Sequence, residues 1–120
     1  MQLASPSSRT SRFPPSTLIN ARLFRILADP TRLAIVELLA DGERPVHELV
    51  AAIGCTQARL SSHLACLRHC RLVETERRGR EVFYRLAIPR LPELIATAGT
   101  IAAPRAEHLA GCRRIGPDWV

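Results

Sequence analysis

The spacing of apolar residues changes twice along this chain, and these changes limit the folds that are open to it. Up to about residue 72, apolar side chains recur three or four residues apart, which is typical of amphipathic helices. The stretch LVETERRGREVFYRLA then alternates between apolar and polar residues, as β-strands do, and Arg78-Gly79 lies where a hairpin turn belongs. The apolar residues on one face of this hairpin are Val82, Tyr84 and Leu86. Helical spacing returns from Pro92, so the sequence predicts a mainly α protein with one β-hairpin.

Start and stop signals divide the first part of the chain into separate helices. Asp29-Pro30 starts a helix, because Asp caps well and Pro suits the first helical position, and Asp41-Gly42 ends it. A short helix ends at Gly54, and Thr56 caps a longer one. A short helix and a tight turn before a longer helix form a helix-turn-helix, and a hairpin after it forms a wing. The predicted fold is therefore mainly α with a β-hairpin wing, a winged helix-turn-helix in the order helix, helix, helix, recognition helix, strand, strand, helix.

The 120 residues fit one domain with two appended segments. Residues 1–17 are rich in Ser and Pro and predict a disordered basic arm, residues 18–103 hold the winged helix, and residues 104–120 form a C-terminal tail. No apolar run reaches the roughly 18 residues that span a bilayer, and the first segment lacks the apolar region of a signal peptide. We therefore expect a cytoplasmic protein without a membrane partner.

The charge of the chain points to nucleic acid. The net charge is +6, and every basic side chain apart from histidine is an arginine, a residue that suits phosphates and guanine edges. Residues 56–85 contain seven Arg and three Glu, so 7 − 3 = +4 of this charge is concentrated there. On the predicted recognition helix and at the wing tip, the residues that we expect to contact double-stranded operator DNA are Gln57, Ala58, Arg59, Ser61, Ser62, Arg77, Arg78 and Arg80.

Two cysteines on the predicted recognition helix form a second candidate site. Cys66 and Cys70 are four residues apart, which places them about 6 Å apart along one face of a helix. Two thiolates can converge there on one soft ion, with metal–sulfur bonds near 2.3 Å or slightly longer. In a cytoplasmic protein, cysteines serve metal or redox chemistry more often than structural disulfides. Cys55 stands alone, and we expect it to pack as a small apolar residue.

Three stretches together carry a family resemblance: LADPTRLAIVELL, TQARLSSHLACLR and RRGREVFYRL. They resemble the winged-helix core of the ArsR/SmtB metalloregulators over residues 20 to 100. The resemblance implies a homodimeric repressor that leaves its operator when an inducer binds. It also implies a dimer interface formed by the first and last helices, here residues 18–27 and 94–101.

The resemblance also bears on the inducer site. The segment HELVAAI stands where the arsenic and cadmium branches carry ELCVCDL, and it has no cysteine. Glu93, Glu107 and His108 do not match the spacing of the zinc branch. The cysteine pair with Cys112 is similar to the CmtR-type cadmium/lead sensors, in which two recognition-helix cysteines of one protomer join a C-terminal cysteine of the other. The implied ligands are thus Cys66, Cys70 and Cys112.

Three thiolates favour large soft ions, so Cd(II) or Pb(II) is the expected inducer, with As(III) and Hg(II) also chemically suitable. A nitrogen ligand from His108 would shift the preference towards Zn(II). The sequence thus predicts a metal-responsive repressor. Two alternatives stay open: a repressor of the same fold that responds to oxidants or sulfur species through its thiols, and a metal-carrying interaction domain. We find no nucleophile–base set and no phosphate loop, so we expect neither an enzyme nor a small-molecule substrate.

Overall fold

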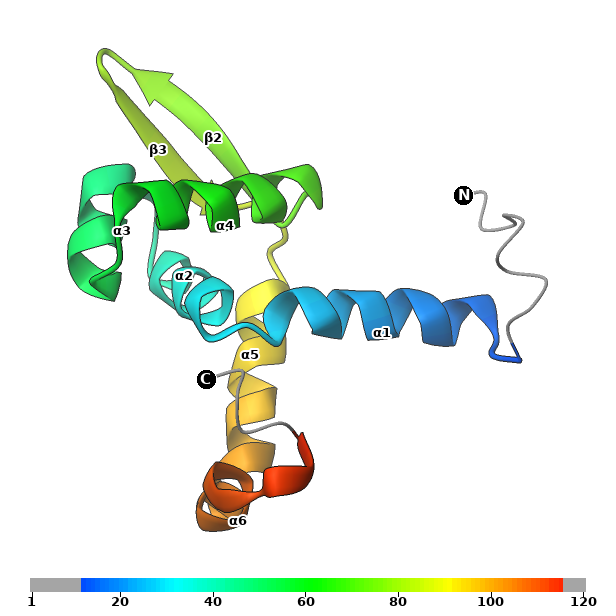
Figure 1. Ribbon diagram of the computed structural model, residues 1–120. Helices are drawn as coiled ribbons and strands as arrows, with labels where there is room; N and C mark the ends of the chain where they lie inside the picture. The colour runs from blue at the N-terminus through cyan, green and yellow to red at the C-terminus, as the bar shows by residue number, and fades with distance from the viewer. Residues whose placement is uncertain (1–11, 116–120) are drawn as a thin grey trace.

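The computed structural model describes residues 12–115, and it has the predicted winged helix-turn-helix fold (Figure 1). The helices and strands are α1 (Pro15–Leu27), α2 (Pro30–Ala40), β1 (Arg44–Pro45), α3 (Val46–Ile53), α4 (Gln57–His69), β2 (Val73–Arg78), β3 (Glu81–Leu86), α5 (Leu91–Ala102), the 3-10 turn η2 (Ala103–Arg105), α6 (Ala106–Gly111) and the 3-10 turn η3 (Arg113–Ile115). The helix-turn-helix consists of α3 and α4, and the wing consists of β2 and β3.

The capping residues begin and end the helices where the sequence predicts. Asp29 Oδ1 accepts a hydrogen bond of 3.0 Å from the backbone N–H of Arg32, which caps α2. Thr56 Oγ1 accepts one of 3.2 Å from the N–H of Arg59, which caps α4. Gly54 ends α3 with a φ of 78°, a left-handed conformation that a residue with a Cβ adopts less readily. These caps fix the tight turn between α3 and α4.

The core forms where α4 packs against α2 and α3. The fully buried side chains of the leucine stripe of α4 and its neighbours are Leu60, Leu64, Leu67, Ile35, Val36 and Leu49. Burying one such side chain contributes about 1.5–3 kcal/mol, so the stripe fixes which face of α4 points inward. The opposite face of the helix is left to solvent.

The sheet has one strand more than the sequence predicts. Its order is β1-β3-β2, all antiparallel, and β1 pairs with β3 through Arg44 and Pro45. A strand of two residues is too short to show alternation in the sequence. Arg78 pairs with Glu81, so the hairpin turn is Gly79-Arg80 and lies one residue later than expected. Gly79 has a φ of 64°, which suits this tight turn.

The ends of the chain differ in detail from the prediction. The arm predicted over residues 1–17 lies mostly outside the described residues, and α1 begins at Pro15 rather than at Leu18. The predicted tail over residues 104–120 contains α6 and η3 as far as Ile115. Among residues 12–115, no helix combines the length and apolarity that crossing a membrane requires.

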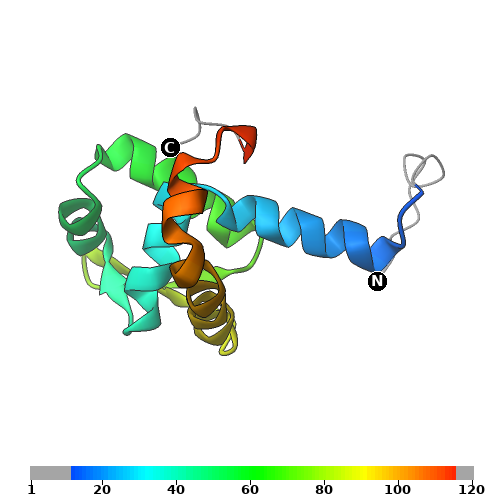
Figure 2. The same cartoon turned by 90° about the horizontal axis from the view of Figure 1, so that it is seen from below.

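Two helices project from the body of the domain. In both views α1 extends away from α3, α4 and the wing, and α5 leads to α6 on the side away from the wing (Figures 1 and 2). Both helices expose large apolar side chains: Phe24 of α1 is 56% exposed and Ile101 of α5 is 60% exposed.

Candidate nucleic-acid interface and thiol site

The outward face of α4 is polar and accessible along its first two turns. Because the leucine stripe holds one face of α4 in the core, the residues on the opposite face point to solvent. The predicted contact residues of this helix are all exposed: Gln57, Ala58, Arg59, Ser61 and Ser62. Small and hydroxyl-bearing side chains permit close approach to a major groove, and the amide of Gln57 can pair with adenine.

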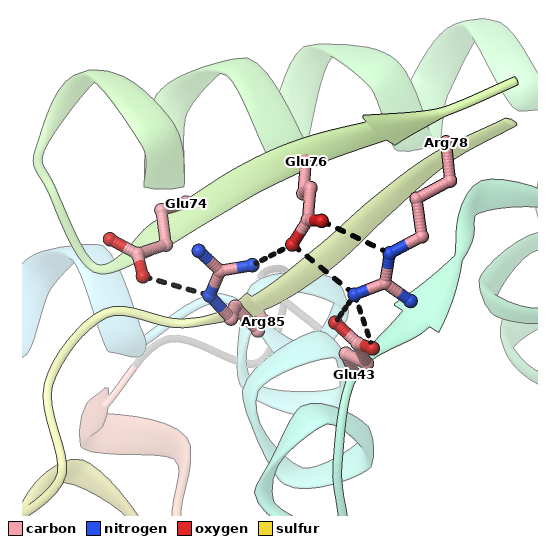
Figure 3. Close-up of polar contacts among 5 residues, drawn as sticks. All are labelled: Glu43, Glu74, Glu76, Arg78 and Arg85. Atoms are coloured by element: carbon pink, nitrogen blue, oxygen red, sulfur yellow. Dashed lines mark hydrogen bonds and ion pairs between the residues drawn. The ribbon is translucent and has the colours of Figure 1, made fainter.

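The wing carries a network of ion pairs that the sequence alone did not predict (Figure 3). Arg78 Nη2 lies 2.7 Å from Glu43 Oε1 and 3.2 Å from Glu76 Oε1, and the guanidinium lies 4.5 Å from the centroid of the Phe83 ring. Arg85 Nε lies 2.8 Å from Glu74 Oε1, and its Nη1 lies 3.0 Å from Glu76. The network joins β2 and β3 to the loop that precedes β1.

These ion pairs shift the pKa values of Glu76, Arg78 and Arg85 towards the charged forms. The hydrogen bond from Arg78, and then its charge, lowers the pKa of Glu76, while the same contacts with Glu76 and Glu43 raise the pKa of Arg78. The hydrogen bond to Glu74 is the largest of the contributions that raise the pKa of Arg85. Both guanidinium groups therefore remain charged and are already paired with carboxylates.

The other two predicted wing residues are less constrained. Arg77 Nη1 donates a hydrogen bond of 3.3 Å to the carbonyl oxygen of Gly79, and Arg80 lies in the turn with an exposed side chain. Within residues 12–115, neither Arg77 nor Arg80 has an acidic partner. Both guanidinium groups can reach a phosphate without first breaking an ion pair.

Cys66 and Cys70 form a pair at the C-terminal end of α4. The backbone N–H of Cys70 still donates to the Cys66 carbonyl at 3.0 Å, so both residues keep helical spacing. Cys66 is half-buried and Cys70 is exposed. Burial and then the adjacent Cys66 thiol raise the pKa of Cys70, and the Arg32 guanidinium opposes this. Two adjacent sulfur donors with open access match the ligands that a thiophilic ion prefers.

Arg32 of α2 contacts both α1 and α4. Its Nε donates a hydrogen bond of 2.8 Å to the carbonyl oxygen of Ile26, and its Nη1 lies 3.5 Å from His63 Nδ1. His63 Nδ1 also lies 3.9 Å from Asp29 Oδ1. His63 lies on the inner side of α4, and its side chain is partly buried. The contact between Arg32 and His63 was not predicted, because the two residues are 31 positions apart in the sequence.

Cys112 does not join the pair within one chain. It is a half-buried residue after α6, and among residues 12–115 no group of three His, Cys, Asp or Glu side chains is placed to hold a metal ion. A three-cysteine site would therefore need Cys112 of a second copy. Cys55 packs against the core, as expected of a small apolar residue.

A shallow groove lies between α1 and the first half of α5. Leu23 of α1 and the α5 residues Leu91, Leu94 and Thr97 are among those that line a hollow of about 370 Å³. An apolar surface of this kind on projecting helices is typical of a surface that a partner covers.

Comparison with known proteins agrees with this description. Residues 29–75 match the model of the family described as "Bacterial regulatory protein, arsR family". A "Probable mercury resistance operon repressor" of Streptomyces lividans is 42% identical over 95 residues, which cover 79% of this chain and 76% of the relative. The "HTH-type transcriptional regulator CmtR" of Mycobacterium bovis is 49% identical over 67 residues, which cover 56% of this chain and 57% of that protein.

A solved structure of a homodimeric winged helix-turn-helix DNA-binding domain from Mycobacterium bovis, a possible ArsR-family transcriptional regulator, is 32% identical. It superposes with a TM-score of 0.67 and covers 90% of this chain and 95% of that one. The expected resemblance to the family is thus confirmed, while the likeness to CmtR is only one among several. The chain belongs to the arsR family of bacterial regulatory proteins, which are transcriptional regulators and not enzymes.

Proposed function

We propose that the protein is a homodimeric transcriptional repressor that binds operator DNA and is released by a soft, thiophilic metal ion. The observation that carries this proposal is the position of the cysteine pair on the recognition helix itself. One helix, α4, bears both the polar face suited to DNA and the thiols suited to a metal. A change at Cys66 and Cys70 therefore bears directly on the element that contacts bases.

The proposed DNA contacts combine base reading and phosphate binding. The exposed face of α4, from Gln57 to Ser62, lies in the major groove, and Arg77 and Arg80 of the wing bind flanking phosphates. Arg78 takes a different part in this proposal, because Glu43 and Glu76 already neutralise its charge. It holds the wing against the body of the domain, and the wing in turn positions its neighbours.

Homodimerisation supplies the symmetry that operator binding needs. It is typical of the family, and the related Mycobacterium bovis domain is described as homodimeric. The exposed apolar residues of α1 and α5, among them Phe24 and Ile101, form the proposed interface. Two copies of α4 would then enter successive major grooves on one side of the duplex.

The proposed inducer site consists of Cys66 and Cys70 of one protomer and Cys112 of the other. When bound, a soft metal ion supplies a centre to which deprotonated thiols attach. Cd(II) and Pb(II) suit three sulfur ligands, and Hg(II) gains support from the name of the Streptomyces lividans relative. As(III) and Zn(II) are further candidates for the inducer. His108, one turn before Cys112, would favour Zn(II) if it took part.

Release follows from linkage between the two sites. If Cys112 is held at the end of α4, this helix is fixed in one orientation and its outward face becomes less accessible to DNA. The metal-bound dimer, in which Cys112 is held near Cys66 and Cys70, then has a lower affinity for the operator. By reciprocity, operator binding lowers the affinity for the metal by the same factor. Couplings of this kind are commonly about 1–3 kcal/mol, or roughly 5- to 150-fold in affinity.

A thiol switch without metal is the second candidate, and the adjacency of the free cysteines Cys66 and Cys70 on α4 favours it. An oxidant that takes up two electrons, with release of the two thiol protons, would join Cys66 or Cys70 to Cys112 as a disulfide. An oxidant response that persists in the presence of a chelator would support this alternative.

The test is fluorescence anisotropy of the reduced protein on DNA from its own promoter. We expect binding without added metal and release by stoichiometric Cd(II), Pb(II) or Hg(II). Binding that none of these ions affects would reject metal sensing but keep DNA recognition. Absence of binding to promoter DNA, with random DNA as control, would reject the repressor.

A further inference from the structure

Two further arginines without an acidic partner among the described residues, Arg68 and Arg71, lie at the C-terminal end of the recognition helix. In the wing, Arg78 and Arg85 are paired with Glu43, Glu74 and Glu76 (Figure 3). Arg68 and Arg71 have exposed side chains and, in the part of the chain that the structure describes, no ion pair. Their charge is therefore available to an outside anion.

These two arginines border the DNA-facing surface. A groove of about 470 Å³ between α4 and the sheet is lined by Ser61, Ala65, Arg68, His69, Arg71 and Tyr84. Ser61 belongs to the polar face proposed to read bases, so the groove continues that face towards the end of the helix. Arg68 and Arg71 also line a second groove beside β2, with Glu74 and Thr75.

Arg71 occupies a backbone position that usually belongs to glycine. Its φ is 65°, and among residues 12–115 it is the only residue other than glycine with a positive φ. The N–H of Leu72 donates to the Leu67 carbonyl at 2.9 Å, and the N–H of Arg71 donates to the Arg68 carbonyl at 3.0 Å. These two bonds define a Schellman motif, in which the left-handed residue is most often Gly because it has no Cβ. An arginine there is conformationally unfavourable, which points to a function for its side chain.

We propose that Arg68 and Arg71 bind backbone phosphates of the operator, next to the bases that α4 reads. This inference rests on the DNA-binding function proposed above and extends its contact surface to the last turn of the helix. Arginine suits this task, because its guanidinium donates two parallel hydrogen bonds to phosphate oxygens. The contact adds affinity without selecting a sequence.

The test compares Arg71→Gly and Arg68→Gln with the unaltered protein on the same promoter DNA over a range of salt concentrations. Each lost phosphate contact lowers the slope of log K against log salt by about 0.9. We expect both variants to bind several-fold more weakly at low salt, with a slope smaller by about one contact each. Arg71→Gly should also raise Tm, because Gly relieves the left-handed position.

For Arg71→Gly, the expected loss of DNA affinity and the expected rise in Tm have opposite signs, which separates a lost phosphate contact from a damaged fold. A variant that only damaged the fold would lose both affinity and Tm. Arg105→Gln is the matched control, since it removes an exposed arginine that has no acidic partner in the described part of the chain and lies beyond α5, and it should keep the slope. If Arg71→Gly and Arg68→Gln bound with unchanged affinity and slope, the inference would be overturned while the repressor proposal stood. If the unaltered protein failed to bind, both would fall.

Discussion

Arg78 of the wing and Glu43 of the loop before β1 are 35 residues apart in the sequence, and their side chains meet at 2.7 Å (Figure 3). This ion pair fastens the hairpin to the loop between α2 and β1, and the stacking of Arg78 over Phe83 joins the two strands of the hairpin. The wing thus has a defined orientation, although its tip has exposed side chains. Within this small surface, some arginines position the wing and others are available to DNA.

We predict that Arg78→Gln and Arg80→Gln will affect DNA binding in different ways. The charge of Arg80 is unpaired, so its removal should lower the slope of the salt dependence by about 0.9. The charge of Arg78 is already balanced by Glu43 and Glu76, so its loss should leave the slope unchanged and lower Tm slightly. Anisotropy titrations at several salt concentrations would measure both. Equal slope changes in the two variants would mean that Arg78 also binds phosphate.

We predict that Cys66→Ser and Cys70→Ser will keep DNA binding but lose the metal response. A hydroxyl keeps the size and polarity of this part of α4, yet it is a poor ligand for a soft ion. The release of roughly 5- to 150-fold expected for the unaltered protein should therefore disappear. Cys55→Ser is the matched control, because Cys55 packs against the core and should keep the response. Normal release of a Cys70→Ser variant by Cd(II) would contradict the thiol site.

We predict that Cys112 acts across the dimer, since one chain does not bring it to the cysteine pair. A Cys66→Ser/Cys70→Ser double variant and a Cys112→Ser variant should each lack a complete site. After they are mixed and allowed to exchange subunits, a mixed dimer should contain one complete site with all three thiols. Thiolate-to-metal absorbance that appears only after mixing would be the expected signature. Full absorbance in either variant alone would argue against the shared site.

The sequence predicted the helical part of the fold well because its signals are local. Asp29 and Thr56 cap the helices that they were expected to cap, and Gly54 ends the short helix. The strand β1 was missed, because two residues that include a proline carry no recognisable alternation. The hairpin turn was misplaced by one residue, because the pairing of Arg78 with Glu81 depends on the partner strand.

The candidate site was harder to predict because it depends on contacts distant in sequence. The spacing of Cys66 and Cys70 was sufficient to predict their adjacency. The count of arginines overstated the charge available at the wing, since it could not show that Glu43 neutralises Arg78. Arg71 was missed for a related reason: its left-handed backbone position is set by the end of α4 and is not visible in composition.

We predict that Phe24→Glu and Ile101→Glu will shift the protein from dimer to monomer. Both side chains are more than half exposed in one chain, so the substitutions should leave the helical content unchanged. A charge buried at an apolar interface is strongly unfavourable, which should weaken self-association and operator binding together. Sedimentation velocity would report the change in mass. Ala51→Glu, on the exposed side of α3, should remain dimeric.

We predict that Asp29 stabilises the fold through its cap and through its charge, and that the second contribution depends on pH. Burial raises the pKa of Asp29, but the Arg32 backbone hydrogen bond and the charges of His63 and Arg32 outweigh it, so the pKa lies below its usual 3.8. Asp29→Ala should lower the free energy of unfolding by about 1 kcal/mol, while Asp29→Asn keeps the cap and loses only the charge.

The pKa shift fixes the direction of the pH effect. Because the folded-state pKa is lowered, the charge of Asp29 stabilises the protein above the unfolded-state pKa, and this contribution is lost as the pH falls through the folded-state value. Urea unfolding of the unaltered protein and Asp29→Asn, followed by circular dichroism from about pH 6 to about pH 3, should show a gap in stability that closes towards acid. A gap that stayed constant over this range would mean that the Asp29 charge contributes nothing to folding.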